Sequence, residues 1–304
     1  MDTQTPLADL NNDLSSFRKV GGVTTVAATP SDVTFENIKK NIKLPCVRFQ
    51  KLPEFKKVKG ENRIALVGGG PSVTKYIDKI KEYRTIFACG SSHDFVQRHG
   101  IIPRYAGICD PDPVSINYFK HPHPETTYLL ASGCDPKIFE HLKEYPIVMW
   151  HCHSDDYNDK LAQIEDHYEG VGGGCTIGLR AICLSVMLGY KNIDFFGFDS
   201  CLSDEQSYAY DLSTQEEKDS QGEVYKLKIG MDWNGPSEKT YSCLGYHLAQ
   251  AEHFRKFLEA YPGLINPTFY GEGLLPDLVR MIYQETLKAD LASGLKKQQE
   301  QVTQ

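Results

Sequence analysis

The sequence has no long apolar run and no excess of basic residues. None of its stretches approaches the roughly 18 uninterrupted apolar residues that a membrane-spanning helix requires, so we expect no membrane span. Its 33 lysines and arginines are outnumbered by 40 aspartates and glutamates, which gives a net charge of −7. Because binding along a nucleic acid needs a basic surface, this balance disfavours general nucleic-acid binding. The 40% hydrophobic and 24% charged fractions of the 304 residues are those of a globular protein.

Two further features indicate a cytoplasmic protein. The N-terminus, MDTQTPLADLNNDL, lacks the charged-then-apolar layout of a signal peptide. The nine cysteines are an odd number, and several lie in or beside apolar runs, where a reduced thiol behaves as a small hydrophobe. These are Cys89, Cys109, Cys134, Cys175 and Cys183. We therefore expect a reducing compartment.

From Arg63 onwards, short apolar runs alternate with segments of helical periodicity. The runs are RIALV (63–67), TIFAC (85–89), YAGIC (105–109), TYLLA (127–131), PIVMW (146–150) and IDFFGF (193–198). Between the first two, Val73, Tyr76, Ile80 and Tyr83 repeat at helical spacing. This alternation predicts an α/β fold with a Rossmann-like, doubly wound and mostly parallel sheet. Ligands bind beyond the carboxyl ends of the strands in such sheets, so we expect the chemistry in the loops after strands.

The chain divides into three parts. Residues 1–60 form an N-terminal arm and leading segment, and residues 61–200 form the Rossmann-like nucleotide-binding core. Residues 201–304 contain an insertion or lid followed by C-terminal helices, because residues 202–240 are polar and break the alternation.

A glycine-rich loop directly follows the first strand of the core. Without β-carbons the backbone can approach a phosphate closely, and amides at the start of a helix can bind it. The loop lacks the Walker GK[ST] ending and the GxGxxG spacing, and its alternative role is a tight strand-to-helix turn. The predicted phosphate-binding residues are Gly68, Gly69, Gly70, Pro71 and Ser72.

A second glycine-rich turn precedes a helix that is apolar nearly all round and ends at Gly189. This turn is predicted either to bind another phosphate or to pack against the first ligand, and its alternative role is close packing of the helix on the sheet. The residues of the turn are Gly172, Gly173, Gly174, Cys175 and Thr176.

Two carboxylates, Asp110 and Asp112, follow the strand YAGIC in the sequence Asp-Pro-Asp-Pro. Two hard oxygen ligands beside a phosphate site suit Mg²⁺, which binds few carboxylates and keeps water and phosphate oxygens. Asp110 and Asp112 are thus candidates for metal binding and for catalysis. The alternative is a proline-stiffened turn with solvated carboxylates.

Smaller signals lie at other predicted strand ends. Candidate contacts to a base, ribose or phosphate are Gly90, Ser91, Ser92, Ser132 and Asp199, although helix capping would also explain a serine or aspartate at such positions. His151 and His153 follow the strand PIVMW and are candidate acids or bases. They do not suit one metal ion, because alternate residues of an extended chain point in opposite directions.

Together these motifs resemble the 6-hydroxymethylpterin diphosphokinase MptE-like family. The resemblance covers residues 61–200 and is carried by VGGGPS, CGSS, ICDPDP and EGVGGGCTIGLRAICLSVMLGYKNIDFFGFDS. It implies a Rossmann-like core. Archaeal members transfer diphosphate from ATP to a hydroxymethylpterin with Mg²⁺. The related motility-associated factors are implicated in attaching nonulosonic sugars to flagellin and look like sialyltransferases. Phage-encoded members have an ending like INPTFYGEGLLP (265–276) here.

The resemblance implies a nucleotide donor held by Gly68 to Ser72, Ser91 and Ser92, with Asp110 and Asp112 on a metal or ribose. Gly172 to Thr176 would complete the pocket, with Asp199 at its edge. The leading hypothesis is a transferase of diphosphate from ATP, with Mg²⁺, to a small hydroxylated acceptor. The alternatives are a glycosyltransferase using a nucleotide sugar, such as a CMP-nonulosonate, and a non-catalytic nucleotide-binding protein. The acceptor stays open, and a homo-oligomer is one option for the assembly.

All of these assignments assume one spatial arrangement. The turns at 68–72, 110–112 and 172–176 should face one another around a common anionic ligand.

Overall fold

The structure is a computed structural model. It describes residues 29–58, 62–154, 156–165, 170–203, 206–210, 223–229 and 239–283, together with the backbone of β1 (Lys19–Val20) and β2 (Val23–Thr24), which pair antiparallel. Parts of the expected arm and insertion, including residues 1–18, 211–222 and 230–238, and the C-terminal residues 284–304 lie outside the described residues.

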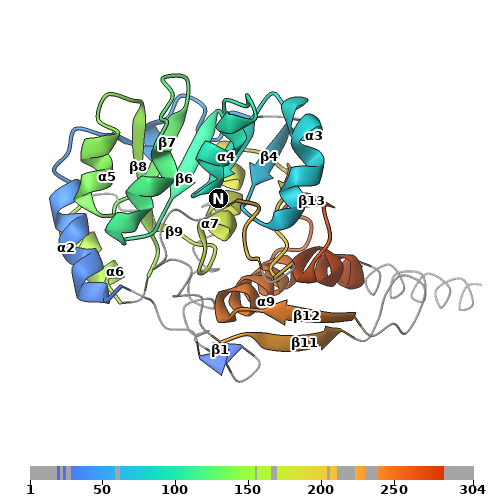
Figure 1. The fold of residues 1–304 in the computed structure, drawn as a ribbon. Helices are drawn as coiled ribbons and strands as arrows, with labels where there is room; N and C mark the ends of the chain where they lie inside the picture. The colour runs from blue at the N-terminus through green and yellow to red at the C-terminus, as the bar shows by residue number, and fades with distance from the viewer. Residues whose placement is uncertain are drawn as a thin grey trace, which may run out of the picture.

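A nine-stranded parallel sheet forms the centre of the molecule (Figure 1). The strand order is β13-β10-β4-β5-β6-β7-β8-β3, and β9 pairs with β8. This arrangement confirms the predicted Rossmann-like fold. The strands are β3 (Val47–Arg48), β4 (Arg63–Val67), β5 (Ile86–Cys89), β6 (Tyr105–Ile108), β7 (Thr127–Ala131), β8 (Ile147–Cys152), β9 (Gly170–Val171), β10 (Asn192–Phe196) and β13 (Asn266–Tyr270).

The apolar runs of the sequence form the central strands because both faces of the sheet are covered. Residues 64–67 of β4 are fully buried, and all four residues of β5 and of β6 are buried. The strand order reverses at β4, which has β5 on one side and β10 on the other. In open α/β sheets this reversal opens a crevice beyond the carboxyl ends of the two diverging strands.

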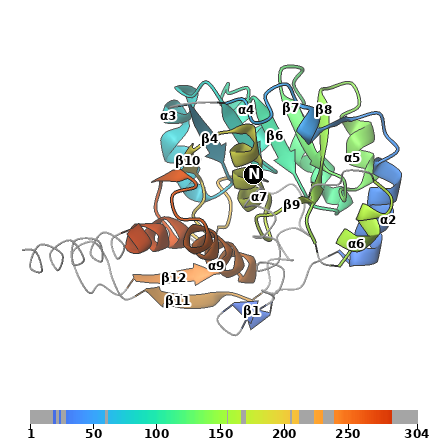
Figure 2. The same ribbon diagram turned by 180° about the vertical axis from the view of Figure 1, so that it is seen from behind.

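Helices cover both faces of the sheet. Figures 1 and 2, seen from opposite sides, show α4 in front of the sheet in one view and α7 in front in the other. The helices are α2 (Ser31–Asn41), α3 (Ile77–Lys81), α4 (Ser92–Arg98), α5 (Pro136–His141), α6 (Asn158–Ala162), α7 (Ile177–Leu188) and α9 (Gly245–Ala260). Three 3₁₀ helices are η1 (Phe49–Lys51), η2 (Pro71–Tyr76) and η3 (Pro113–Phe119), and residues 274–283 are also helical.

The segment after β4 differs from the expected single helix. It begins as the 3₁₀ helix η2 and becomes α-helical only in α3, and Tyr76 between them has φ −124°. Pro71 at the start of η2 has no N–H to donate. Val73 and Ile80 are nevertheless buried, so the apolar spacing marks the inward face even though the helix type changes.

The strongly apolar helix α7 is buried as its composition predicts. The Thr176 side chain accepts a hydrogen bond from the N–H of Leu179 at 3.3 Å and caps the first turn. Gly189 ends the helix with φ +106°, a left-handed conformation that favours glycine.

The core takes strands from both flanking parts of the chain. β13 adds to the sheet beside β10, and the short β3 adds at the opposite edge. Phe195 of β10 stacks on Phe269 of β13 with ring centroids 4.4 Å apart. α9 and the antiparallel pair β11 (Tyr225–Ile229) and β12 (Lys239–Cys243) form a further layer below the sheet in Figure 1.

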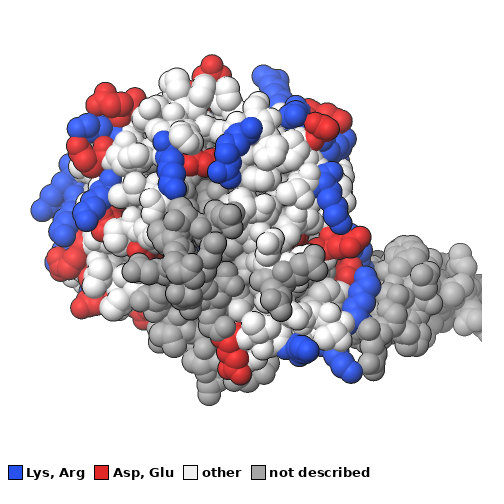
Figure 3. Space-filling view, viewed as in Figure 1, with Lys and Arg blue, Asp and Glu red and all other residues white. Residues whose placement is uncertain are grey.

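The helix α2, which precedes the core, is tied to the loop after β7 by buried asparagines. The side-chain amide of Asn41 donates to the carbonyl oxygens of Ser132 and Cys134 at 2.9 and 2.8 Å, and that of Asn37 donates to Gly133 at 3.2 Å. No helix among the described residues is both long and apolar enough to cross a membrane. On the face drawn in Figure 3, lysines and arginines stand among aspartates and glutamates.

A buried carboxylate in β10 provides a test of the packing. Asp194 accepts hydrogen bonds from Arg63 at 2.7 and 2.9 Å and from the Tyr83 hydroxyl at 2.5 Å. We predict that Asp194→Ala lowers the free energy of unfolding by roughly 2–4 kcal/mol, because the half-buried Tyr83 phenol and the Arg63 guanidinium lose their acceptor. Urea denaturation measures this change. The control Lys79→Ala, which removes an exposed ion pair with Glu82, should leave the midpoint unchanged.

Candidate active site

The backbone amides of the loop after β4 are already bonded within the protein. The N–H groups of Gly68 and Gly70 donate to carbonyl oxygens at the end of β10, at 2.8 and 2.9 Å. The N–H of Ser72 donates to the Asp199 carboxylate at 2.8 Å, and the Ser72 hydroxyl donates to the other oxygen of that carboxylate. These N–H and O–H donors therefore join the loop after β4 to the loop after β10, at the switch point where the strand order of the sheet reverses. They are not available to a phosphate in this arrangement.

Asp199 lies inside the protein, whereas the family resemblance implies a position at the edge of the nucleotide pocket. Its side chain is almost completely buried, and burial raises its pKa although the two bonds from Ser72 oppose the rise. The residue is thus explained by its contact with the glycine loop.

Gly69 is the glycine of this loop that faces two tyrosines. A β-carbon at Gly69 would lie 2.5 Å from the hydroxyl oxygen of Tyr210 and 2.7 Å from the ring of Tyr208. The N–H of Ala209 also donates to the Gly69 carbonyl at 2.9 Å. Glycine is therefore required here because residues 207–210 pack directly on the loop.

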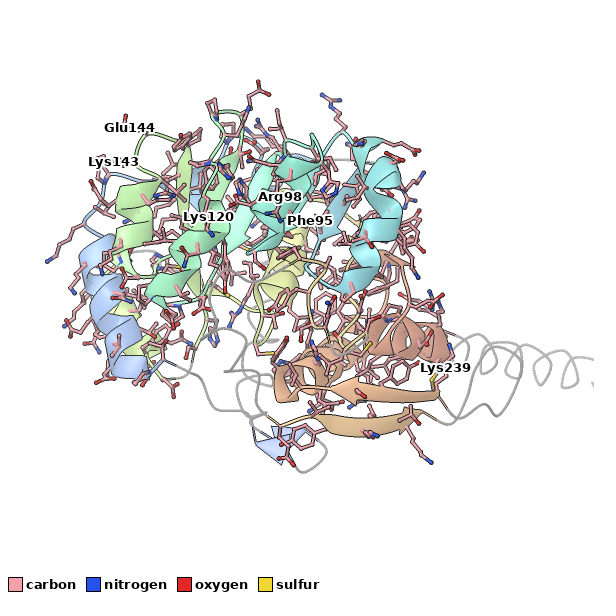
Figure 4. The ribbon with its side chains drawn as sticks, viewed as in Figure 1. Phe95, Arg98, Lys120, Lys143, Glu144 and Lys239 are labelled. Atoms are coloured by element: carbon pink, nitrogen blue, oxygen red, sulfur yellow. The ribbon has the colours of Figure 1, made fainter. Side chains whose placement is uncertain are left out.

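Tyr210 connects this loop to the next one. Its hydroxyl lies 2.8 Å from the Ser91 hydroxyl, and its ring stacks on Phe95 of α4 with centroids 5.1 Å apart. Figure 4 shows Phe95 and Arg98 on this helix. Burial raises the pKa of Tyr210, so the phenol stays protonated and can donate a hydrogen bond. Sequence reasoning missed Tyr208 and Tyr210, although the YAY pattern inside a polar stretch was a visible signal.

The second glycine turn is held by an arginine of α7. Gly173 and Gly174 have φ +119° and +95°, and the Arg180 side chain donates to the Gly174 carbonyl at 2.9 Å and to the His153 carbonyl at 3.2 Å. Arg180 also donates to the carbonyl of Val171. Arg180 lies within an apolar helical segment, so no role for it is predicted from the sequence.

The Phe198 ring packs between the glycine loop after β4 and the first turn of α7. β-carbons at Gly68 and at Gly178, in that first turn, would lie 3.2 and 2.7 Å from the ring. Phe198 ends the run IDFFGF, which the sequence predicts only as a strand. The convergence of the turns at 68–72, 110–112 and 172–176 on one anionic ligand stays a prediction.

The two carboxylates after β6 form consecutive turns. The Asp110 carboxylate accepts the N–H of Asp112 at 3.0 Å, and the Asp112 carboxylate accepts the N–H of Val114 at 2.8 Å and caps η3. Asp110 is exposed, yet desolvation by the surrounding protein raises its pKa, and repulsion from Asp112 adds to the rise. Among the described residues no three acidic, histidine or cysteine side chains gather as a metal site. A Mg²⁺ ion would fit here only with phosphate and water oxygens as its other ligands.

The two candidate histidines are held by hydrogen bonds inside the protein. The His151 ring is buried, with Nδ1 2.8 Å from the Ser132 hydroxyl and Nε2 3.3 Å from the Glu165 carboxylate. Burial opposes ionisation of Glu165, but hydrogen bonds from His151 and Arg48 outweigh it and lower its pKa to about 2. His153 lies 2.5 Å from the Asn158 amide. His151 and Ser132 therefore belong to a buried polar chain.

Comparison with known proteins shows which family the chain belongs to. A model of the 6-hydroxymethylpterin diphosphokinase MptE-like proteins matches residues 33–205, which is more than half of the chain. The chain belongs to this family. No curated protein matches the sequence of this MptE-like chain.

Several solved structures are similar to this MptE-like protein. The MAf glycosyltransferase from Magnetospirillum magneticum AMB-1 has a TM-score of 0.59 and 15% identity over 82% of this chain and 38% of that chain. The sialyltransferase CstII from Campylobacter jejuni, solved with cytidine-5'-monophosphate, has a TM-score of 0.40 and 15% identity over 73% and 88%. A mammalian sialyltransferase has a TM-score of 0.35 and 10% sequence identity over 81% of each chain. The chain spans well under half of the MAf protein, and such low identity shows the fold alone. Membership of this family supports a nucleotide-related transferase.

The raised pKa of Asp110 yields a testable consequence. Because the folded state disfavours its ionised form, Asp110→Asn should raise the free energy of unfolding at pH 7, by roughly 0.5 kcal/mol since the side chain is exposed. This gain in stability should shrink as the pH falls through the pKa of Asp110 in the folded protein. It should disappear below the pKa of an unfolded aspartate, about 3.9, because Asp110 is then protonated in both states.

Urea denaturation between pH 4 and pH 7 measures this gain. Asp135→Asn is the matched control, because the Asp135 carboxylate also accepts the N–H of the residue two positions further on, and asparagine can replace it as the cap of α5. A loss of stability in Asp110→Asn at pH 7 would contradict the assignment.

Proposed function

We propose that the chain is a nucleotide-dependent transferase whose donor binds beyond the carboxyl ends of β4, β5 and β6. The observation that carries the proposal is the contact of Tyr210 with Ser91 and Gly69 at the switch point of the sheet. Hydroxyl groups of two loops meet there, and Asp110 follows the neighbouring strand. This is where open α/β sheets bind their ligands.

The backbone hydrogen bonds of the glycine loop favour a nucleotide donor that places few phosphate groups against that loop. The amides of Gly68, Gly70 and Ser72 bond to β10 and to Asp199, so they cannot also cradle a triphosphate. The hydroxyls of Ser91 and Tyr210 are bonded to each other, so one of the two still has a proton to donate to a single phosphate group. Glycosyl transfer from a nucleotide sugar, which releases a nucleoside phosphate, is therefore the reaction that the geometry supports best.

Asp110 is the residue best placed to assist such a reaction. An acceptor hydroxyl would attack the anomeric carbon of the donor sugar, and the bond from that carbon to the phosphate oxygen would break. The Asp110 carboxylate would take the proton of the hydroxyl, and its raised pKa makes it a stronger base than an ordinary aspartate. No covalent intermediate with the protein is needed.

Diphosphate transfer from ATP is the second candidate. The observation that favours it is the pair of carboxylates, Asp110 and Asp112, each of which uses one oxygen in its turn. Mg²⁺ bound there would offset negative charge on the phosphates of a bound nucleotide. The acceptor of either reaction is left unassigned.

Thermal-shift measurements with CMP, UDP, ATP and CMP-sugars, each with and without Mg²⁺, distinguish the candidates. A ligand that binds only the folded state raises its melting temperature. We expect stabilisation by a nucleoside phosphate or nucleotide sugar without metal, and slow release of the nucleoside phosphate from the matching sugar donor. Stabilisation by ATP with Mg²⁺ alone would instead support diphosphate transfer. Binding with no turnover of any donor would indicate a non-catalytic nucleotide-binding protein.

Variants at the tyrosine contact test the site itself. Tyr210→Phe should weaken nucleotide binding roughly tenfold, because one hydrogen bond to a charged group contributes about 1.4 kcal/mol. Gly69→Val should weaken it further by displacing Tyr208 and Tyr210. The control Tyr283→Phe alters an exposed hydroxyl in the C-terminal helical segment and should bind like the parent. Unchanged affinity in both site variants would place the nucleotide elsewhere.

A further inference from the structure

The second glycine-rich turn, residues 172–176, has backbone N–H groups to offer to a ligand. The N–H groups of Gly172 and Gly173 bond to no acceptor in the part of the chain that the structure describes, although both residues are buried. The loop after β4 differs, because the N–H groups of Gly68 and Gly70 are both bonded within the protein. Buried N–H groups without an acceptor are rare in proteins, so the donors of the second turn call for a bound group.

The side chain of Arg180, in α7, sets the direction of these peptide groups. It donates to the carbonyl of Val171 and, at 2.9 Å, to the carbonyl of Gly174. Both peptide bonds that follow are trans, and in a trans peptide the carbonyl and the next N–H point in opposite directions. The N–H groups of Gly172 and Cys175 therefore point away from the guanidinium.

The positive charge of Arg180 forms no ion pair with a carboxylate of the described residues. Its hydrogen bonds end on the neutral carbonyls of Val171, Gly174 and His153. A cation that is only partly exposed is stabilised by an anion nearby. The charge and the N–H groups of the turn lie one peptide group apart, so both favour a negatively charged group at the turn.

The turn leads into α7 beside the proposed donor site. Ile177, the first residue of α7, packs against the ends of β5 and β6, since β-carbons at Gly90 and at Gly107 would lie 3.5 and 3.3 Å from its side chain. Gly90 directly precedes Ser91, whose hydroxyl bonds to that of Tyr210. The start of this twelve-residue helix adds its positive end to the same region.

We propose that Arg180 is a positioning residue, which holds the carbonyls of the second glycine-rich turn so that its N–H groups bind an oxyanion of the donor. The identity of the ligand rests on the proposed function. The oxyanion is either the phosphate of the donor or a carboxylate of its sugar, two groups that backbone N–H donors bind in the same way. Of the two glycine-rich segments, the loop after β4 serves packing and the turn before α7 serves binding.

Selective labelling compares the two segments in one spectrum of the full-length protein. Valine precedes glycine at three places, 20–21, 67–68 and 171–172, so carbonyl-¹³C valine combined with ¹⁵N glycine selects three amides. Val67→Ile and Val171→Ile each remove one signal and so assign the spectrum. Titration with CMP, inorganic phosphate and CMP-N-acetylneuraminate should shift the Gly172 signal and leave the Gly68 signal in place. A response to CMP assigns the phosphate, and a response to CMP-N-acetylneuraminate alone assigns the carboxylate.

The same titrations separate this inference from the proposed function. If a nucleotide raises the melting temperature and the Gly172 signal does not move, only the role of the turn is overturned. A shift of Gly68 in place of Gly172 would overturn that role as well. If no nucleotide stabilises the protein but inorganic phosphate shifts Gly172, the turn binds anions and the proposed donor is wrong. No response to any of the three anions would contradict both.

Variants of two arginines separate positioning from folding. Arg180→Lys keeps the charge but cannot bond to three carbonyls at once, so it should lower the affinity for inorganic phosphate roughly tenfold. The control Arg48→Lys also disturbs bonds to two carbonyls, those of Ile42 and Cys46, and should lower the melting temperature without changing that affinity. Parental affinity in Arg180→Lys together with a lowered melting temperature would show a merely structural arginine and overturn its assignment.

Discussion

The switch point of the sheet depends on one buried carboxylate. Asp199, after β10, accepts the N–H and the hydroxyl of Ser72, after β4. The loop after β13 closes over the pair, since a β-carbon at Gly271 would lie 2.4 Å from the Ser72 hydroxyl oxygen and one at Gly273 would lie 2.4 Å from the Asp199 carbonyl oxygen. A buried carboxylate is tolerated only when its oxygens are well bonded, so three loops are held together by one hydrogen-bonded group.

This contact changes the meaning of the glycine-rich motif. Glycines after a strand predict close approach by some other group, and the sequence cannot say whether that group is a phosphate or the protein itself. Here the close neighbours of Gly68 and Gly70 are the backbone of Gly197 and the Asp199 carboxylate. Each N–H that bonds to these groups is not available to bind a ligand. The recognition of a phosphate is left to side-chain hydroxyls on the outer side of the loop.

The sequence predicted the sheet well because its signals are local. Every buried apolar run except PIVMW is followed by glycine, serine or aspartate, and parallel strands bring their ends to one edge. It missed groups whose roles depend on distant contacts. β13 contains a proline and polar residues, and its parallel pairing with β10 and the stacking of Phe269 on Phe195 make it an edge strand of the sheet. Tyr210 meets Gly69 and Ser91 across more than a hundred residues, and Arg180 acts through carbonyls of other loops. No local pattern records such distances.

The loops at the carboxyl ends of the strands differ along the sheet: those beyond β7 and β8 are covered by other parts of the protein, and those beyond β5 and β6 are more exposed. Beyond β7 and β8, Ser132, His151, Glu165 and Arg48 bond in series, and α2 covers the loop after β7. The buried ring of His151 contacts other side chains of the protein through both of its nitrogens. Beyond β5 and β6 the loops end in hydroxyls and in the exposed carboxylate of Asp110. We therefore place the proposed chemistry on the β4 to β6 side of the sheet.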